Sequence, residues 1–494
     1  MKKFLTLTII AIIALIGLSV SVNAATTLQE QIDAATSGAT ITLDKNYTED
    51  IVIKDNKEIT INLNEKKLTS VSSNTITVEL GSKLTVEGEG EIITNVSNRA
   101  AIFNNGTTII NGGTIKKEAV KNYYNITNHG DMEINGGTII NDFAYVSGET
   151  HGSLVENGYY SYSSGDQFTG YVSGVNQAKP TLTINGGTFN GGLNTIKNDD
   201  GGILTINAGT FKNNIQVALF NVNDATIKGG TFEVPTGNDK TTVYNRKYDD
   251  STDIGKLTVT GGTFKAEYFI QTNGTMWGEV SIKGGTFDIT KGLVNPKNED
   301  GTDRPQMNPE VTGGTFSSDV NQYISGDTTW TYDEKGNMVI FVPIYLDKPT
   351  NVKWDGTKAT WDAVPNADGY GIMLTNGEWS IQQPIWVDGT SYDFSKYLTD
   401  KNAEYIFIVW AEGNGNPYYY SDDAESEAYV FPAEEPKVEE DKTTSGQGTT
   451  EQQPAKDEKD DTPKTGSVDV VVFASAIVAV ISLGGIVLVK KYAR

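Results

Sequence analysis

Few side chains in this sequence are suited to catalysis. The chain has no Cys and only two His, His129 and His151, so nucleophilic catalysis by a Cys–His or Ser–His pair has little to build on. Both His stand in Gly-containing turn sequences, Asn128-His129-Gly130 and Thr150-His151-Gly152, and no further ligands follow at the spacing of a metal site. We therefore expect no catalytic residue, no metal and no cofactor.

Acidic residues cluster in two Gly-rich turns, at Asn198-Asp199-Asp200 and at Glu299-Asp300. Hydrolysis of a glycosidic bond requires two carboxylates that lie about 5 Å or about 6.5 to 9.5 Å apart. Sequence spacing does not define such a distance. Cleavage of a polysaccharide by a lyase or glycoside hydrolase is therefore kept as the second hypothesis, behind a binding or structural role.

Tyrosines gather in the segment 145–171, which is also rich in Ser and Gly. Tyr159, Tyr160, Tyr162 and Tyr171 could stack on sugar rings, because an aromatic ring offers a flat apolar face with a polar tip. The alternative is that these side chains pack against the outside of the domain that carries them. The four tyrosines are the candidate ligand-binding residues.

A pentad near the C-terminus, Thr462-Pro463-Lys464-Thr465-Gly466, stands directly before an apolar segment. Residues 468–489 have no charge after Asp469 and are long enough to cross a hydrocarbon core of about 30 Å as a helix. Basic residues follow in 490–494, and the positive-inside rule places them on the cytoplasmic side. We expect this helix to be the chain's only contact with a membrane.

The pentad, helix and basic tail together resemble the LPXTG-type cell-wall sorting signal of Gram-positive surface proteins, over residues 462–494. The resemblance implies that a sortase cleaves between Thr465 and Gly466 and transfers the acyl group of Thr465 to a peptidoglycan amine. Pro463 favours the kinked, extended peptide that such an enzyme would bind. Thr462 stands where the family has Leu, which leaves the accepting sortase class open.

Residues 1–24 predict a secretory signal peptide. Lys2 and Lys3 precede an apolar run, and the small-residue site ending at Ala24 predicts cleavage before Ala25. An uncleaved anchor is disfavoured because polar sequence begins directly afterwards. The mature chain is therefore expected outside the cell, secreted and attached to the peptidoglycan of the cell wall.

The composition agrees with this location and excludes one class of partner. The formal net charge is −24 and the pI is about 4.5, whereas nucleic-acid binding requires a basic surface. Without Cys, the stability of the fold must come from packing and hydrogen bonds. We expect no nucleic-acid partner.

A short repeat occupies most of the chain and decides the expected fold. Its threonines stand at spacings of 24, 50, 22, 21, 32, 23 and 29 residues, at Thr114, Thr138, Thr188, Thr210, Thr231, Thr263, Thr286 and Thr315. A period in the low twenties suits one coil of a parallel β-solenoid, since a propeller blade needs about 40 residues. Leu182, Ile184 and Phe189 should point into the core, with the corner Asn185-Gly186-Gly187 turning through positive φ.

Weaker strand patterns precede the repeats at 39–43, 51–53, 59–63 and 76–86, and a short helix is expected over 27–36. Leu28, Ile32 and Ala35 share one face of this helix and should cover the open first coil. Residues 25–345 as a whole resemble the right-handed parallel β-helix superfamily typified by pectate lyases. The resemblance implies the fold and leaves binding or cleavage of carbohydrate as expectations.

The pattern changes to short strands and turns over 346–432, which resembles a fibronectin type III domain. Trp361 matches the early core Trp of such domains, and Tyr405 is a candidate for their tyrosine corner. Residues 433–461 have scarcely any apolar side chain and should form a disordered acidic stalk.

The sequence thus predicts an all-β protein: a right-handed parallel β-helix, then a fibronectin type III-like β-sandwich, with a C-terminal transmembrane helix. Its function is expected to be that of a wall-anchored adhesin, a rod that binds carbohydrate or protein of a host or neighbouring cell. A structural spacer without a ligand is a further alternative.

Overall fold

The computed structural model describes residues 26–118, 122–141, 143–144, 146, 151–159, 179–237, 239–247, 254–271, 278–298, 301–304, 308–376, 380–415 and 417–433. The predicted cleavage site at Ala24 and Ala25 and the motif from Thr462 to Gly466 lie outside these residues. Within them, no helix is both long and apolar enough to cross a membrane, and the predicted span 468–489 again lies outside.

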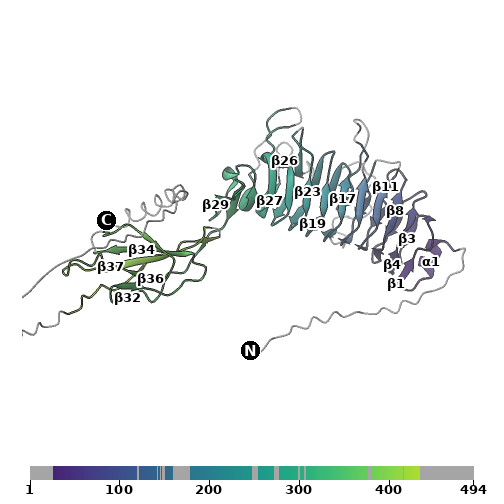
Figure 1. The fold of residues 1–494 in the computed structure, drawn as a ribbon. Coiled ribbons are helices and arrows are strands. Elements are labelled where there is room, and N and C mark those ends of the chain that lie inside the picture. Colours follow the sequence, from purple (N-terminus) through teal and green to yellow (C-terminus); the bar gives the residue numbers. More distant parts are fainter. Residues whose placement is uncertain are drawn as a thin grey trace, which may run out of the picture. The chain divides into compact units, whose positions relative to one another are not determined.

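The first part of the chain is a parallel β-solenoid of about nine turns (Figure 1). Each coil contributes three strands, and each strand pairs in parallel with its equivalent one coil later. The predicted parallel β-solenoid is therefore confirmed.

The three strands of a coil form three sheets that run along the solenoid. The first sheet contains β1 (Ala39–Thr42), β4 (Glu58–Asn62), β7 (Lys83–Glu87), β10 (Thr107–Ile110), β13 (Asp131–Ile134), β16 (Thr181–Ile184), β19 (Ile203–Ile206), β22 (Asp224–Ile227) and β25 (Lys256–Val259). The second contains β2 (Tyr47–Thr48), β5 (Lys66–Thr69), β8 (Gly90–Thr94), β11 (Thr114–Lys117), β14 (Thr138–Asn141), β17 (Thr188–Gly191), β20 (Thr210–Lys212) and β23 (Thr231–Glu233). The third contains β3 (Ile51–Ile53), β6 (Ile76–Val78), β9 (Ile102–Asn104), β12 (Ile126–Asn128), β15 (Val155–Asn157), β18 (Asn194–Asn198), β21 (Val217–Asn221) and β24 (Thr241–Asn245).

Two long strands continue through the corners in the last coils. β26 (Thr263–Gln271) pairs with both β23 and β24, and β27 (Glu279–Val294) pairs with β25 and β26. The predicted strand 76–86 is wrong in extent, because a turn at Gly81 with φ +82° separates β6 from β7.

The repeat motif places its apolar residues in the core as predicted. Leu182, Ile184 and Phe189 are buried, and in the described coils from 189 to 316 the repeat phenylalanines stack with ring centroids 4.5 to 4.9 Å apart. The corner turns through positive φ as predicted, and of Asn185, Gly186 and Gly187 it is Gly187 that has this conformation, at +97°. One left-handed residue is enough to turn the chain here.

Asparagines form a second internal ladder along the third sheet, which the sequence analysis missed. From Asn104 to Asn221, each amide nitrogen donates to the amide oxygen of the next member at 2.7 to 2.8 Å. The members are Asn104, Asn128, Asn157, Asn198, Asn221 and Asn245. These side chains are buried, so the chain of hydrogen bonds offsets the cost of placing amides in the core.

Both ends of the solenoid are covered. At the N-terminal end lies α1 (Leu28–Ala34), whose capping box joins Thr27 and Glu30 and whose Leu28 and Ile32 are buried in the solenoid core, as predicted. At the other end, β28 (Glu310–Phe316) pairs with β30 (Met338–Phe341), which in turn pairs with β29 (Thr329–Tyr332), both in antiparallel fashion. The short helix η1 (Asn321–Tyr323) lies between β28 and β29 in the sequence. Antiparallel pairing ends the parallel stack.

The C-terminal part contains two antiparallel sheets and one short parallel pair. The sheet with strand order β35-β34-β37-β39 contains β34 (Gly369–Thr375), β35 (Ile385–Val387), β37 (Ile406–Glu412) and β39 (Ala424–Glu425). The other contains β32 (Lys353–Asp355), β33 (Lys358–Thr360) and β36 (Ser391–Asp393), and β31 (Ile344–Tyr345) pairs with β38 (Tyr418–Tyr419). An aromatic core of Trp361, Tyr370, Phe394 and Phe407 lies between the two sheets.

The phenylalanine stack provides a test of the solenoid core. We expect Phe232→Ala to lower the free energy of unfolding by about 3 to 5 kcal/mol, because the ring is fully buried between two neighbouring rings. Chemical denaturation followed by far-UV circular dichroism measures the change. Tyr332→Ala, at a side chain that is 58% exposed, should change it by less than about 0.5 kcal/mol. Equal effects of the two substitutions would contradict the role of the stack.

Candidate functional site

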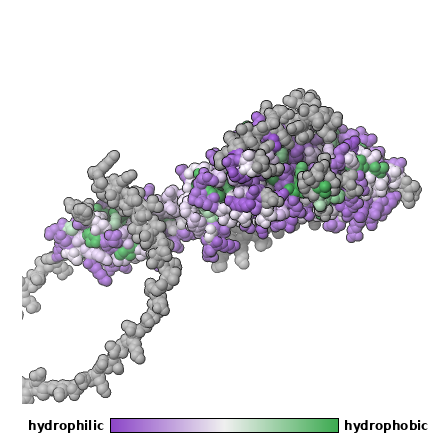
Figure 2. Space-filling model, turned by 90° about the horizontal axis from the view of Figure 1, so that it is seen from above, coloured by the Kyte–Doolittle hydropathy of each residue, from purple (hydrophilic) through white to green (hydrophobic). Residues whose placement is uncertain are grey.

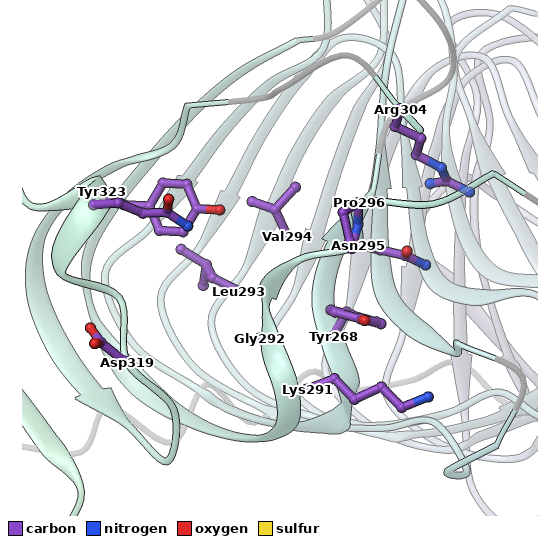
Figure 3. A pocket seen from close by; sticks show the side chains of 11 residues that line it. Tyr268, Lys291, Gly292, Leu293, Val294, Asn295, Pro296, Arg304, Asp319 and Tyr323 are labelled. Carbon is purple, nitrogen blue, oxygen red and sulfur yellow. The ribbon is translucent and has the colours of Figure 1, made fainter. Parts of the chain in front are cut away.

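A hollow of about 340 Å³ lies beside the last coils of the solenoid (Figure 3). This volume is at the lower end of the range of small-molecule sites, which starts at about 300 Å³. Its lining comes from β26, the end of β27, the segment after β27 and η1, and consists of Tyr268, Lys291, Gly292, Leu293, Val294, Asn295, Pro296, Arg304, Asp319, Gln322 and Tyr323.

Tyr268 lines the hollow beside a glycine of the neighbouring strand. Tyr268 on β26 pairs with Gly292 on β27. A methyl group at Gly292 would lie 3.8 Å from Cε1 of Tyr268, in contact with the ring, and the φ of +155° at Gly292 disfavours other residues. The ammonium of Lys291 lies over the Tyr268 ring, 6.0 Å from its centroid, so the phenol packs beside a cation at the edge of the hollow.

Lys291 supplies a cation that the protein itself compensates. Its ammonium lies 2.8 Å from Oδ1 of Asp239 and 3.0 Å from Oε1 of Glu267. Hydrogen bonds to Asp239 and then Glu267 raise the pKa of Lys291, so it stays charged. Because two carboxylates surround this ammonium, it does not give the hollow an excess of positive charge.

The remaining lining combines a second phenol with polar groups of several kinds. Burial raises the pKa of Tyr323, whose hydroxyl therefore stays protonated. Figure 3 shows Arg304 and Asp319 on opposite sides of the hollow. Aromatic rings next to amide, guanidinium and carboxylate groups match a ligand with apolar ring faces and many hydroxyls, as a sugar has.

The sequence analysis did not identify this hollow, although a signal was present. Successive repeat threonines Thr286 and Thr315 are 29 residues apart, which exceeds the basic period in the low twenties. The interval includes the segment after β27, which contributes Asn295, Pro296 and Arg304 to the lining of the hollow.

The predicted tyrosine site is described at one residue only. Tyr159 is 2% exposed, its hydroxyl donates to the carbonyl oxygen of His129 at 3.1 Å, and its ring contacts the His129 ring. This Tyr packs against the solenoid and offers no open face. Tyr160, Tyr162 and Tyr171 lie outside the described residues, and their binding role stays a prediction.

The two histidines are both buried. His129 directly follows β12 and lies between the rings of Phe103 and Tyr159. Burial lowers its pKa to about 4, so it is neutral at pH 7. Nε2 of His151 accepts a hydrogen bond from the backbone N–H of Val146 at 3.3 Å. Among the described residues, no group of three or more His, Asp and Glu could hold a metal ion.

A cluster of charged residues lies on the outward row of the third sheet. Register aligns Thr127, Glu156, Lys197 and Phe220 on four successive coils. Lys197 forms an ion pair with Asp199, and its ammonium lies 3.4 Å from the hydroxyl of Tyr124. Two carboxylates and one lysine on neighbouring coils are the residue types that cleavage of a polysaccharide would use.

This cluster is closed to solvent. Glu156, Lys197 and Asp199 are 3%, 7% and 0% exposed, so a polymer cannot reach them in this conformation. Burial raises the pKa of Glu156, with Lys197 opposing the shift. One buried cation balances one carboxylate, and the second carboxyl group keeps its proton. The cluster therefore joins three coils by ionic and hydrogen-bonding contacts.

Comparison of the chain with models of protein families, with curated proteins and with solved structures finds no match in any of the three.

The protonated Glu156 predicts a specific dependence of stability on pH. The pKa rises from 4.5 in the unfolded chain to about 8 in the fold, so the unfolded chain binds fewer protons between these values. The contribution of protonated Glu156 to the free energy of unfolding is complete below about pH 4.5 and is lost as the pH rises toward 8. The free energy of unfolding of the wild type should fall as the pH is raised from about 5 to about 8.5. In Glu156→Gln, we expect this fall to be smaller by about 1 to 3 kcal/mol, because Gln carries no proton to lose. Denaturation curves at both pH values measure this difference. Glu279→Gln, at an exposed carboxylate, should follow the wild type, and parallel behaviour of Glu156→Gln would refute the assignment.

Proposed function

We propose that this protein is displayed on the cell wall of a Gram-positive bacterium and binds a sugar residue of a surface glycan in the hollow beside the last coils. The observation that carries the binding proposal is that two phenols, Tyr268 and Tyr323, line one hollow of about 340 Å³ together with polar side chains. Tyr323, Arg304, Asn295 and Asp319 supply the donors and acceptors for hydroxyl groups.

Export and anchoring are supported by the sequence at the two ends. The predicted signal peptide 1–24 directs secretion, and the motif from Thr462 to Gly466 with its apolar segment and basic tail matches a sorting signal. Sortase and peptidoglycan are the partners in this step, with Thr465 as the residue that becomes covalently attached.

Two finer fold assignments accompany this proposal. The solenoid is assigned to the right-handed, pectate lyase-like β-helices, and residues 346–432 to fibronectin type III-like domains. Support for the second comes from the buried Trp361 and from Tyr405, whose hydroxyl accepts the N–H of Asp400 at 3.0 Å, five residues upstream. The strand orders β35-β34-β37-β39 and β32-β33-β36 also agree with a seven-stranded sandwich.

Binding without cleavage is preferred to polysaccharide cleavage. The acids and lysine of the Glu156 cluster are buried, whereas Tyr268 lines an open hollow. The third hypothesis is a structural spacer without a ligand, because the solenoid fold would serve that role equally well.

Substitution in the hollow tests the binding proposal. On a glycan array, we expect Tyr268→Ala to weaken binding of the recognised glycan about tenfold, because loss of a stacked ring costs about 0.5 to 1.5 kcal/mol beyond its area. Tyr332→Ala, which removes an exposed Tyr of the solenoid cap, should bind like the wild type.

The same purified chains decide between the three readings. Release of unsaturated or reducing sugar from a polysaccharide by the wild type, lost in Glu156→Gln, would establish cleavage instead. Absence of binding to every glycan would favour the spacer, and equal binding by wild type and Tyr268→Ala would place the site elsewhere.

A second substitution tests the anchor. We expect Thr465→Ala to abolish covalent attachment to the wall, because the resemblance to a sorting signal implies that sortase recognises the Thr side chain next to the bond that it cleaves. Digestion of isolated cell walls with a muramidase, followed by blotting, measures the attached fraction. Thr450→Ala, in the predicted stalk, is the matched control and should stay attached. Retention of Thr465→Ala in the digested wall fraction would refute the sorting signal.

A further inference from the structure

Two tryptophans cover glycines on the outer face of the four-stranded sheet in the C-terminal part. Along β34, Tyr370, Ile372 and Leu374 are buried, and Tyr370 contacts Trp361 in the core between the sheets. Gly369 and Gly371 alternate with these residues and therefore face the opposite side. Register places Gly371 between Trp386 on β35 and Trp410 on β37.

Each indole lies directly over the backbone of one glycine. A methyl group at Gly369 would be 2.3 Å from Cζ2 of Trp386, and one at Gly371 would be 2.2 Å from Cε2 and Cζ2 of Trp410. Any larger residue at these positions would lift the rings from the sheet. The glycines thus hold the indoles against the sheet, and Trp386 keeps 51% of its surface exposed.

Carboxylates two residues further along the chain hold both rings in place. Nε1 of Trp386 donates to Oδ1 of Asp388 at 2.6 Å, and Nε1 of Trp410 donates to Oε1 of Glu412 at 2.5 Å. Because both indole N–H groups are used internally, the surface presents ring faces rather than donors. The second oxygen of each carboxylate can accept a hydrogen bond from a ligand.

Three tyrosines extend this surface. The rings of Tyr345, Tyr419 and Tyr420 contact one another with centroids 5.1 to 5.9 Å apart, and Tyr345 and Tyr420 are 60% and 49% exposed. The backbone N–H of Ser421 donates to the carbonyl oxygen of Ala411 at 2.9 Å, so the chain at Tyr420 runs beside the chain that follows Trp410. We call Trp386, Trp410, Tyr345, Tyr419 and Tyr420 the aromatic platform.

We propose that the aromatic platform binds a neutral polysaccharide by stacking of its sugar rings, as a site separate from the solenoid hollow. Ordered ring faces suit the apolar faces of pyranose rings, and the carboxylates at their edges suit sugar hydroxyls. Asp388 and Glu412 accept hydrogen bonds from the two indoles of the platform, and Asp422 follows Tyr420 by two residues. A polyanion such as a polyuronate would therefore be repelled.

A purely structural role for the tryptophans makes a different prediction. An aromatic side chain can stabilise a glycine in a strand by covering its backbone. In that case, substitution of Trp386 would lower stability and leave glycan binding unchanged. The half-exposed Trp386 and the exposed tyrosines exceed what the cover of two glycines requires.

Co-sedimentation with insoluble neutral glycans tests the platform. The purified full chain is mixed with microcrystalline cellulose, chitin or insoluble mannan, and soluble polygalacturonate is examined by affinity electrophoresis. We expect the wild type to bind at least one neutral glycan and not polygalacturonate. Trp386→Ala and Trp410→Ala should each weaken that binding about tenfold or more, since loss of a stacked aromatic costs on the order of 1 kcal/mol or more. Trp330→Ala is the matched control, because Trp330 is an exposed Trp on the solenoid cap.

Each other outcome overturns the proposal. The proposal is wrong if the chain binds polygalacturonate in place of neutral glycans, or if it binds no glycan. It is also wrong if Trp386→Ala and Trp330→Ala bind equally well. Trp386→Phe keeps a ring on Gly369 and should bind with an intermediate affinity, and thermal unfolding checks that all variants fold. Tyr268→Ala leaves the platform intact, so a loss confined to that variant would assign binding to the hollow alone.

Discussion

The solenoid depends on one constraint: each residue lies next to its equivalent residue one coil later, at the spacing of neighbouring strands, about 4.8 Å. A side chain must therefore pack well against a side chain of the same or a similar type on the next coil. Phenylalanine meets this condition by stacking its ring, and asparagine meets it because an amide is both donor and acceptor. The Asn198 amide, for example, accepts from Asn157 and donates to Asn221, so a buried polar group is satisfied only as part of the row.

Extra residues enter such a stack most easily between strands. The segment after β27 is an addition of this kind, and β26 and β27 pair at Tyr268 and Gly292 after a register shift of one residue between Ala266 and Tyr268. The solenoid supplies a rigid wall, and the added segment supplies the second side of the hollow. Sites that bind ligands are thus separated from the contacts that stabilise the coils.

Outward positions follow a different rule from inward ones. Thr127, Glu156, Lys197 and Phe220 occupy one row on successive coils, yet no two are alike. Here neighbours complement one another in charge and polarity, and burial makes that complementarity necessary, because two ionised carboxylates beside one lysine would be costly. In the C-terminal part the outward face of β34 is different again, because Gly369 and Gly371 leave room for indole rings to lie on the sheet. The coloured surface in Figure 2 is predominantly hydrophilic.

The sequence by itself determined the solenoid, the inward positions of Leu182, Ile184 and Phe189, and the helix that covers the first coil, because these depend on a repeated pattern and on contacts between equivalent residues. It did not determine which corner residue takes positive φ, or that 76–86 divides into two strands, since a turn is decided by a single residue within a periodic pattern. Only the tertiary structure brought Tyr268 to Tyr323, Glu156 to Lys197, and Trp386 to Gly369. Such neighbours are distant in the chain and belong to no period, so their distances follow from strand register and from the length of the segments between strands.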